Sequence, residues 1–250
     1  SSSTPSTPLP PPAPQMPSNF EATITDVRLI ENALHFSMPP SCGEGHLEVA
    51  VAMNGADFVP VEDCLYVHAP LRVAKPSPAI GPRAGGSMLR LSGKELRHSR
   101  HLAVAFLQGA TRIEVQARFE EGTVVCTTPR WPVEPVEGEL STSAIVEVSL
   151  NGQEWSTSSR RFTFYDYAPT SVEPPVGAAQ GGTVLKLLGD VPAAAATVNC
   201  VRVRFACADD GKAQVVEGAV EEGAIVCTSP AFEHDANLFE TSVSVALNGA

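Results

Sequence analysis

The chain carries one ten-residue segment twice, and this repetition limits the possible folds more than any other feature. EEGTVVCTTP at residues 120 to 129 returns as EEGAIVCTSP at residues 221 to 230. A weaker third copy, IENALHFSMP, lies at residues 30 to 39 and ends on a proline in the same place. Recurrence of this kind indicates tandem copies of one structural unit.

Two further anchors recur at nearly the same period. Asn-Gly follows an alternating apolar run at Asn54, Asn151 and Asn248, so that both intervals are 97 residues. A double glycine that opens a strand-like segment begins at Gly85 and again at Gly181, which is 96 residues later. Asn-Gly between two such runs favours a type I′ turn, in which both central residues have positive φ. We therefore expect a hairpin at each Asn-Gly.

This period matches the size of one immunoglobulin-like β-sandwich. In the middle copy polar and apolar residues alternate, as they do in a strand with one buried face, so Leu89 and Leu91 are expected to face inward and Arg90 outward. We predict an all-β fold of tandem immunoglobulin-like β-sandwiches with about seven strands each. The strands predicted for the middle copy are 71–75, 88–93, 102–107, 113–119, 123–129, 144–152 and 160–167.

The anchors also predict the domain organisation. Residues 1–19 have prolines spaced by three, which indicates a stiff Pro-rich linker in polyproline II conformation. Residues 20–69 match only the second half of a repeat, and 70–167 form a complete one. Residues 168–250 match a repeat that lacks its last strand. We expect the chain to be a piece of a longer polypeptide, or to receive the missing strands from elsewhere.

Composition narrows the class of partner. The net charge is −11, with 17 basic and 28 acidic residues and no run of Lys or Arg, which disfavours a nucleic-acid partner. The longest apolar runs are too short to span a membrane. None of the asparagines begins a glycosylation sequon, which favours an intracellular protein.

The six cysteines show no CxxC spacing, so a zinc ribbon is not expected. We expect buried free thiols that fill core space, with Cys126 and Cys227 pointing into the core. A bridge between Cys207 and Cys227 stays open, because these segments can be neighbouring strands.

Taken together, the anchors resemble the IPT/TIG domain, an immunoglobulin-like domain of plexin and transcription-factor type. The resemblance covers residues 70–250 well and 20–69 loosely, and filamin-type repeats are the nearest alternative. It implies a seven-stranded sandwich and no single function. The residues that carry it are Gly81-Pro82, Gly85-Gly86-Ser87, Gly93, Val104-Ala105-Phe106, Cys126-Thr127-Thr128-Pro129, Val146-Glu147-Val148 and Phe162-Thr163-Phe164, with Gly181-Gly182-Thr183, Gly189, Val203-Arg204-Phe205 and Cys227-Thr228-Ser229-Pro230 in the second copy.

No motif for catalysis, phosphate binding or metal binding is present, so we expect no enzyme, cofactor or metal site. The acidic pairs before Gly122 and Gly223 are read as hairpin tips. Two features are candidates for protein contact. One is the pair Trp131 and Trp155, which have no tryptophan counterparts in the third copy. The other is the most basic loop of the chain, with Arg97, His98, Arg100 and His101.

The sequence therefore predicts a non-enzymatic structural or protein-interaction module within a larger assembly, of cytoskeletal or axonemal type. The expected location is intracellular, in the cytoplasm, cytoskeleton or cilium. One alternative is an extracellular or cell-surface adhesion or receptor segment, and a second is a DNA-binding domain of transcription-factor type. The expected partners are other proteins. Neither a nucleic acid, nor membrane insertion, nor a small-molecule substrate is expected.

Overall fold

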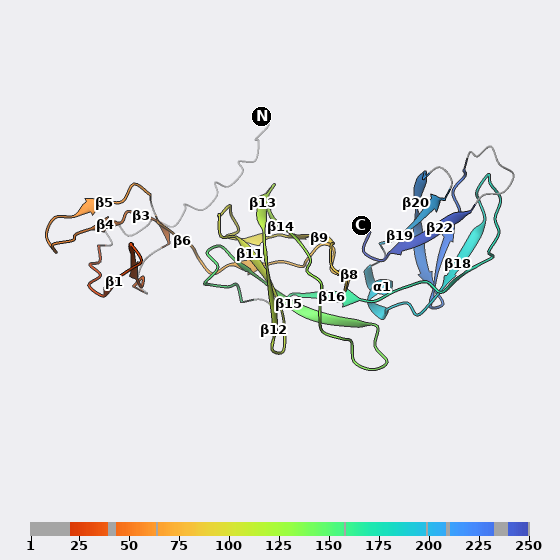
Figure 1. Cartoon of the computed structure of the whole chain (residues 1–250), viewed down its shortest axis with the longest axis horizontal. Helices are drawn as coiled ribbons and strands as arrows, with labels where there is room; N and C mark the ends of the chain where they lie inside the picture. The colour runs from red at the N-terminus through yellow and green to blue at the C-terminus, as the bar shows by residue number, and fades with distance from the viewer. Residues whose placement is uncertain are drawn as a thin grey trace, which may run out of the picture. The chain divides into compact units, whose positions relative to one another are not determined.

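The structure is a computed structural model that describes residues 21–39, 44–63, 65–157, 159–198, 200–208, 211–232 and 240–249. The predicted Pro-rich linker 1–19, as well as Cys42 and Cys64, lies outside these residues. The chain divides into two compact units, 1–69 and 70–250 (Figure 1). The predicted domain boundaries stay a prediction.

The first unit forms three separate two-stranded ladders, and every described residue of 21–69 keeps some exposure to solvent. A sandwich core needs two facing sheets, which such ladders do not provide. Apolar side chains such as Leu29 (66% exposed) and Met53 (82%) therefore remain open to solvent. The ladders pair β1 (Val27–Ile30) with β2 (Ala33–Phe36), β3 (Gly45–Leu47) with β6 (Leu65–Val67), and β4 (Ala50–Val51) with β5 (Val59–Pro60).

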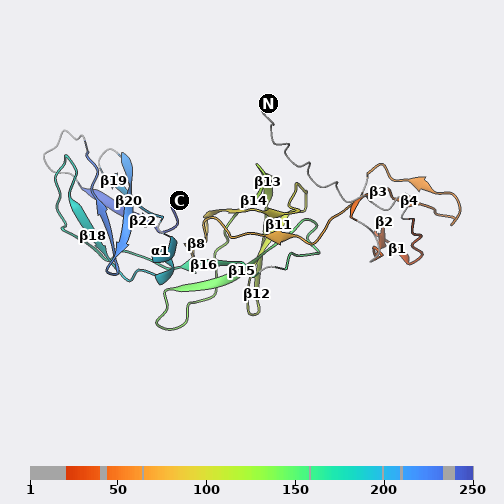
Figure 2. The ribbon, with the colours of Figure 1, turned by 180° about the vertical axis from the view of Figure 1, so that it is seen from behind.

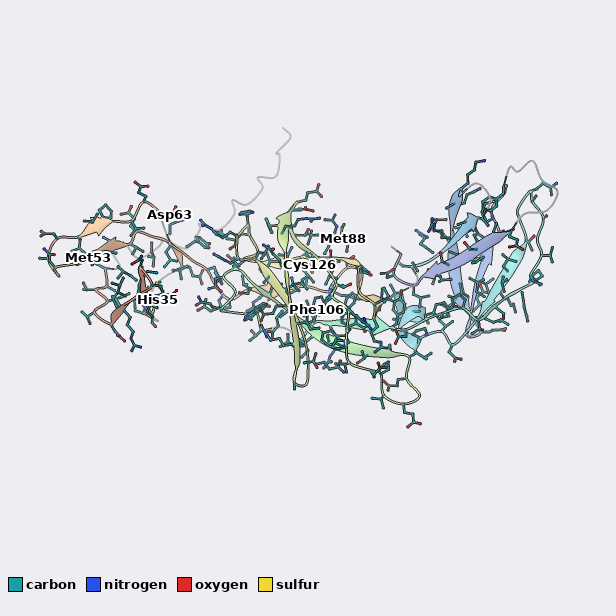
Figure 3. All side chains as sticks on the ribbon, viewed as in Figure 1. His35, Met53, Asp63, Met88, Phe106 and Cys126 are labelled. Atoms are coloured by element: carbon teal, nitrogen blue, oxygen red, sulfur yellow. The ribbon has the colours of Figure 1, made fainter. Side chains whose placement is uncertain are left out.

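The second unit begins with a β-sandwich that we call the second sandwich. Its larger sheet has the order β12-β11-β15-β16-β8 and its smaller sheet the order β13-β14-β9, with a short β10-β7 pair beside them. Phe106 from the larger sheet and Cys126 from the smaller one, both labelled in Figure 3, lie in one shared core. The strands are β7 (Arg72–Val73), β8 (Ile80–Pro82), β9 (Met88–Leu91), β10 (Gly93–Lys94), β11 (Ala103–Gln108), β12 (Thr111–Gln116), β13 (Arg118–Glu120), β14 (Thr123–Thr127), β15 (Ser141–Ser149) and β16 (Arg161–Tyr165).

The predicted inward and outward faces are confirmed in this sandwich. Leu89 and Leu91 are fully buried, whereas Arg90 between them is exposed. Strands are present at all seven predicted places with shifted ends, but the predicted strand 113–119 is divided into β12 of the larger sheet and β13 of the smaller one. Two further short strands, β8 and β10, were not predicted. One of them, β8, lies between the predicted strands 71–75 and 88–93 and pairs in parallel with β16 instead of belonging to a hairpin.

The third sandwich follows (Figure 2). Its six strands are hydrogen-bonded in the order β17-β18-β21-β20-β19-β22. Cys227 lies in its core together with Phe205 and Leu187. The all-β immunoglobulin-like fold is thus confirmed. The elements are β17 (Ser171–Glu173), β18 (Val184–Leu188), α1 (Ala193–Val198), β19 (Val201–Cys207), β20 (Ala213–Glu221), β21 (Ala224–Thr228) and β22 (Thr241–Ala246).

The double glycine and the Thr-x-Pro segment recur because they form a single structural element. The N–H of Gly86 donates to the carbonyl of Thr128 (2.9 Å), and the N–H of Thr128 donates to that of Ser87 (2.8 Å). Gly85 has a φ of 79°, and a Cβ on it would lie 2.6 Å from the carbonyl carbon of Pro129. The third sandwich repeats this contact between Gly181 and its own proline segment. Both anchors are therefore required by one close backbone approach.

The type I′ turn lies at a different position from the one predicted. At the tip between β13 and β14, Glu121 and Gly122 have φ of 49° and 79°, as a type I′ turn requires. The acidic pair is therefore a hairpin tip, as expected. The prediction of a type I′ turn at Asn-Gly is wrong: at Asn151 the side-chain Oδ1 accepts hydrogen bonds from the N–H groups of Gln153 and Glu154. The side-chain oxygen organises a wider turn in which only the glycine has positive φ.

Several hydrogen bonds connect the second and third sandwiches. The N–H of Leu247 donates to the hydroxyl of Tyr165 (3.2 Å), and Nδ2 of Asn248 donates to Oγ of Ser87 (2.8 Å). Tyr165 and Ile80 also belong to the buried cluster that contains the core of the third sandwich. We call these contacts the joint.

Candidate interaction surface

The basic loop connects β10 to β11 at one end of the second sandwich. Ser99 fixes its shape, since its hydroxyl donates to the carbonyl of Leu150 (2.5 Å) and accepts from the N–H of His101 (3.1 Å). Arg100, His98 and His101 are exposed, and Arg97 is half-buried. The Ser99–Leu150 hydrogen bond ties this loop to the turn that carries Trp155.

Trp155 lies on the outer face of the larger sheet of the second sandwich. Ser156, the next residue, is held against β15, where it exchanges two hydrogen bonds of 2.9 Å with the backbone of Val148. The guanidinium of Arg112 lies 4.3 Å from the centre of the Trp155 ring. Arg112 is also paired with Glu114 (2.7 Å) and Glu147 (3.5 Å). Trp155 is thus a half-buried aromatic with a charged rim, a composition that is common at protein interfaces.

Trp131 is placed differently, because it is only 1% exposed. Its ring stacks on Phe164 with centroids 4.9 Å apart, and its indole N–H donates to Oε1 of Gln108 (3.1 Å). Burial removes Trp131 from the set of contact candidates.

Trp131 has a counterpart in the third sandwich that the alignment of the repeats did not identify. Phe232 occupies the matching position of the third sandwich, where its N–H bonds the carbonyl of Ala179 as the N–H of Trp131 bonds that of Arg83. A count of two residues from Pro129 and from Pro230 would have identified the pair.

The core cysteines behave as expected from their burial. Cys126 and Cys227 are each 5% exposed, and burial raises the pKa of Cys126 from 9.0 to about 12 and raises that of Cys227 as well. Cys207 and Cys227, for which a bridge was left open, are both free thiols. The raised pKa values of Cys126 and Cys227 keep these two thiols protonated, which makes them poor nucleophiles.

Metal binding and membrane spanning receive no geometric support in the described residues. No group of three His, Cys, Asp or Glu side chains among them is placed to hold a metal ion, so His98 and His101 have no third ligand there. Within the same residues no helix has the length and apolarity needed to cross a bilayer.

Positive and negative charges are unevenly distributed along the chain. Residues 70–101 hold seven of the 17 Lys and Arg residues but one of the 28 Asp and Glu residues, a net +6 in a chain of net −11. A charge count by segment would have found this difference.

Comparison with known proteins gives no family. No protein-family model matches the chain, and no curated protein matches it. Among similar solved structures is the full extracellular region of plexin A4, domains 1 to 10, with 19% identity over 79% of this chain and 16% of that one, at a TM-score of 0.49. A second structure of that region, domains 1 to 8, has 17% identity over 72% of this chain and 17% of that one, at a TM-score of 0.40. The chain thus spans less than a fifth of either.

One expectation is overturned here. The expected intracellular location is contradicted, because both similar structures are extracellular regions; the cytoskeletal and ciliary settings have no support. Membership of the IPT/TIG family or of filamin-type repeats stays a prediction.

Proposed function

We propose that the chain is a non-enzymatic protein-interaction module of tandem IPT/TIG-like sandwiches, located outside the cell or at its surface. The contact surface in this proposal combines Trp155 with the exposed part of the basic loop, Arg100, His98 and His101. The half-buried Arg97 belongs to the same loop.

The proposal rests on the end of the second sandwich that carries the basic loop and the turn at Asn151. The corresponding end of the third sandwich forms the joint. In the third sandwich the matching segments are α1, which replaces the basic loop, and the turn at Leu247 and Asn248. Those segments contact the preceding sandwich: α1 lies beside β8, and the turn bonds Tyr165 and Ser87. This end of the fold is thus suited to docking on another protein surface. In the second sandwich it carries charge and an aromatic ring where α1 carries only apolar and small residues.

The free cysteines do not oppose an extracellular setting. Oxidation proceeds through the thiolate, and burial keeps Cys126 and Cys227 protonated. Cys207 is buried as well, which leaves Cys200 as the exposed thiol among the described cysteines. Labelling of intact cells with a membrane-impermeant amine reagent tests the setting: we expect the protein to be labelled, and protection until the cells are lysed would contradict it.

The contact surface is tested by photo-cross-linking in intact cells. A photoreactive residue replaces Arg100, and in a matched control it replaces Val215, which is 60% exposed on the third sandwich. We expect a protein adduct from position 100 and none of the same mass from position 215. Adducts only within the chain itself, or identical adducts from both positions, would contradict the proposal.

A further inference from the structure

A second surface of the same sandwich has a different chemistry. On the outer face of the smaller sheet, Arg90 and Arg118 lie on either side of Val125, which stands in register with both. Beyond β9, Lys94 is directly opposite Arg72. We call Arg72, Arg90, Lys94 and Arg118 the basic face.

Among the residues that the structure describes, three of these four cations have no ion-pair partner. Arg118 is ion-paired with Glu120. Arg72, Arg90 and Lys94 are exposed, and among the described residues none of them forms an ion pair. Like charges directly opposite each other across two strands are destabilising, so the Arg72–Lys94 pair costs the fold stability.

Gly93 enforces this juxtaposition. A Cβ at Gly93 would lie 2.0 Å from the carbonyl oxygen of Arg72, so only glycine allows β10 to approach β7 this closely. The next residue is Lys94, which the approach brings opposite Arg72. The backbone therefore holds two like charges together where a neutral pair would serve the fold equally well.

The third sandwich provides the internal control. The positions that match Arg90 and Lys94, 96 residues later, are Lys186 and Asp190, and Lys186 is directly opposite Glu173. The same fold thus forms with a balanced face. Because the architecture does not require the cations of the second sandwich, they call for another explanation.

We propose that the basic face docks a short acidic segment of a partner protein, in extended conformation and with an apolar residue beside its carboxylates. Arg90 and Lys94 are four residues apart on adjoining strands, about 13 Å, which two carboxylates four residues apart in an extended segment can match. Met88, labelled in Figure 3, lies on the same face and is 51% exposed, so it offers an apolar contact next to Arg90.

The charge of the remaining chain favours a short protein segment over a long polyanion. Outside residues 70–101 the chain carries ten basic and 27 acidic residues, a net −17. A nucleic acid or a long sulfated glycan extends beyond the basic face and meets this repulsion, whereas a segment of about six residues, roughly 20 Å long, stays close to the face. This inference adds a second contact surface to the proposed function. It rests on the proposed function in one respect, namely that the partner is a protein.

The test uses the full chain and a defined probe, the capped peptide Glu-Ser-Glu-Ser-Glu-Ser-Leu with a fluorescent label, in which Leu lies on the same face as the three carboxylates. We expect binding by fluorescence anisotropy at low salt that weakens as salt is added. Arg90→Glu should reduce the affinity at least tenfold. Lys94→Asp, which installs the residue of the third sandwich, should act likewise. The matched control Lys186→Glu makes the same charge reversal on the balanced face and should change the affinity less than twofold.

Four results would overturn the inference. They are no binding of the peptide at low salt, equal losses from Arg90→Glu and Lys186→Glu, tighter binding of a sulfated oligosaccharide than of the peptide, and a self-association that Lys94→Asp abolishes. Matching thermal melts of the variants show that they are folded. The peptide does not involve the basic loop, so failure here leaves the cross-linking result at Arg100 unaffected, and the reverse also holds.

Discussion

Replacing Trp131 by Phe tests the assignment of this residue to the core. The ring is 1% exposed, stacked on Phe164, and hydrogen-bonded through its N–H to Gln108. Full truncation of a buried Trp costs about 3–5 kcal/mol. Phe keeps most of the packing but loses the hydrogen bond, worth about 1 kcal/mol. It also loses ring area and leaves a small void, together about 1–2 kcal/mol. We therefore expect Trp131→Phe to lower the free energy of unfolding by about 2–3 kcal/mol.

The matched control is Trp155→Phe, the same chemical change at a half-buried position. It weakens a partly exposed cation–π contact with Arg112, so the expected loss is about 0.5 kcal/mol or less. The chain has two tryptophans, and each variant keeps one of them in the second sandwich, so fluorescence during urea unfolding reports on that sandwich. A loss below about 1 kcal/mol for Trp131→Phe, or equal losses for the two variants, would refute the core assignment.

Four further predictions concern single positions. Gly93→Ala should destabilise the second sandwich by at least about 2 kcal/mol in urea unfolding, because its Cβ clashes with backbone. Tyr167→Phe should raise the thermal midpoint, since the Tyr167 hydroxyl is buried without a hydrogen-bond partner among the described residues; a lowered midpoint would contradict this. At pH 8 a thiol reagent should modify Cys200 rapidly and Cys126 only after unfolding. Because the pKa of Cys126 is about 12 in the folded state and 9.0 in the unfolded state, the contribution of Cys126 to stability should be complete below pH 9. Between pH 9 and pH 12 the free energy of unfolding should fall by about 1.4 kcal/mol per pH unit. Asn248→Ala removes the hydrogen bond to Ser87 and should loosen the joint. Amide hydrogen exchange should become faster around Ser87 and stay unchanged inside both sandwiches.

The sequence predicts the architecture of the second and third sandwiches well because one backbone constraint recurs in both. Alternation assigns Leu89 and Leu91 to the core, since a strand with one buried face leaves that pattern. Local chemistry predicts the turns less well. Asn-Gly suits a type I′ turn, but the side-chain oxygen of Asn151 accepts hydrogen bonds from two backbone N–H groups, and a different turn forms. Glu121 adopts positive φ where sequence preference does not indicate it, because the hairpin register requires it.

The candidate site is less predictable, because it depends on contacts between distant segments. Trp131 and Trp155 are the same residue type within 24 positions of each other, and no local pattern separates the buried one from the half-exposed one. Besides the counterpart of Trp131 at Phe232, the stacking on Phe164 and the cation–π contact with Arg112 distinguish them. The pairing of Arg72 with Lys94 is likewise set by long-range strand register.

The two sandwiches can be used as controls for each other. Where equivalent positions carry the same group, as Cys126 and Cys227 do, packing of the shared fold is a sufficient reason for the residue. Where the equivalents differ in charge, as Lys94 and Asp190 do, packing of the shared fold is not a sufficient reason for the residue. The basic face meets this second condition and also costs stability through like-charge contact, a combination that favours a binding role over chance. The same reasoning removes Trp131 from consideration, because Phe232, which is partly buried against the core of the third sandwich, shows that this position takes an aromatic ring packed on the core.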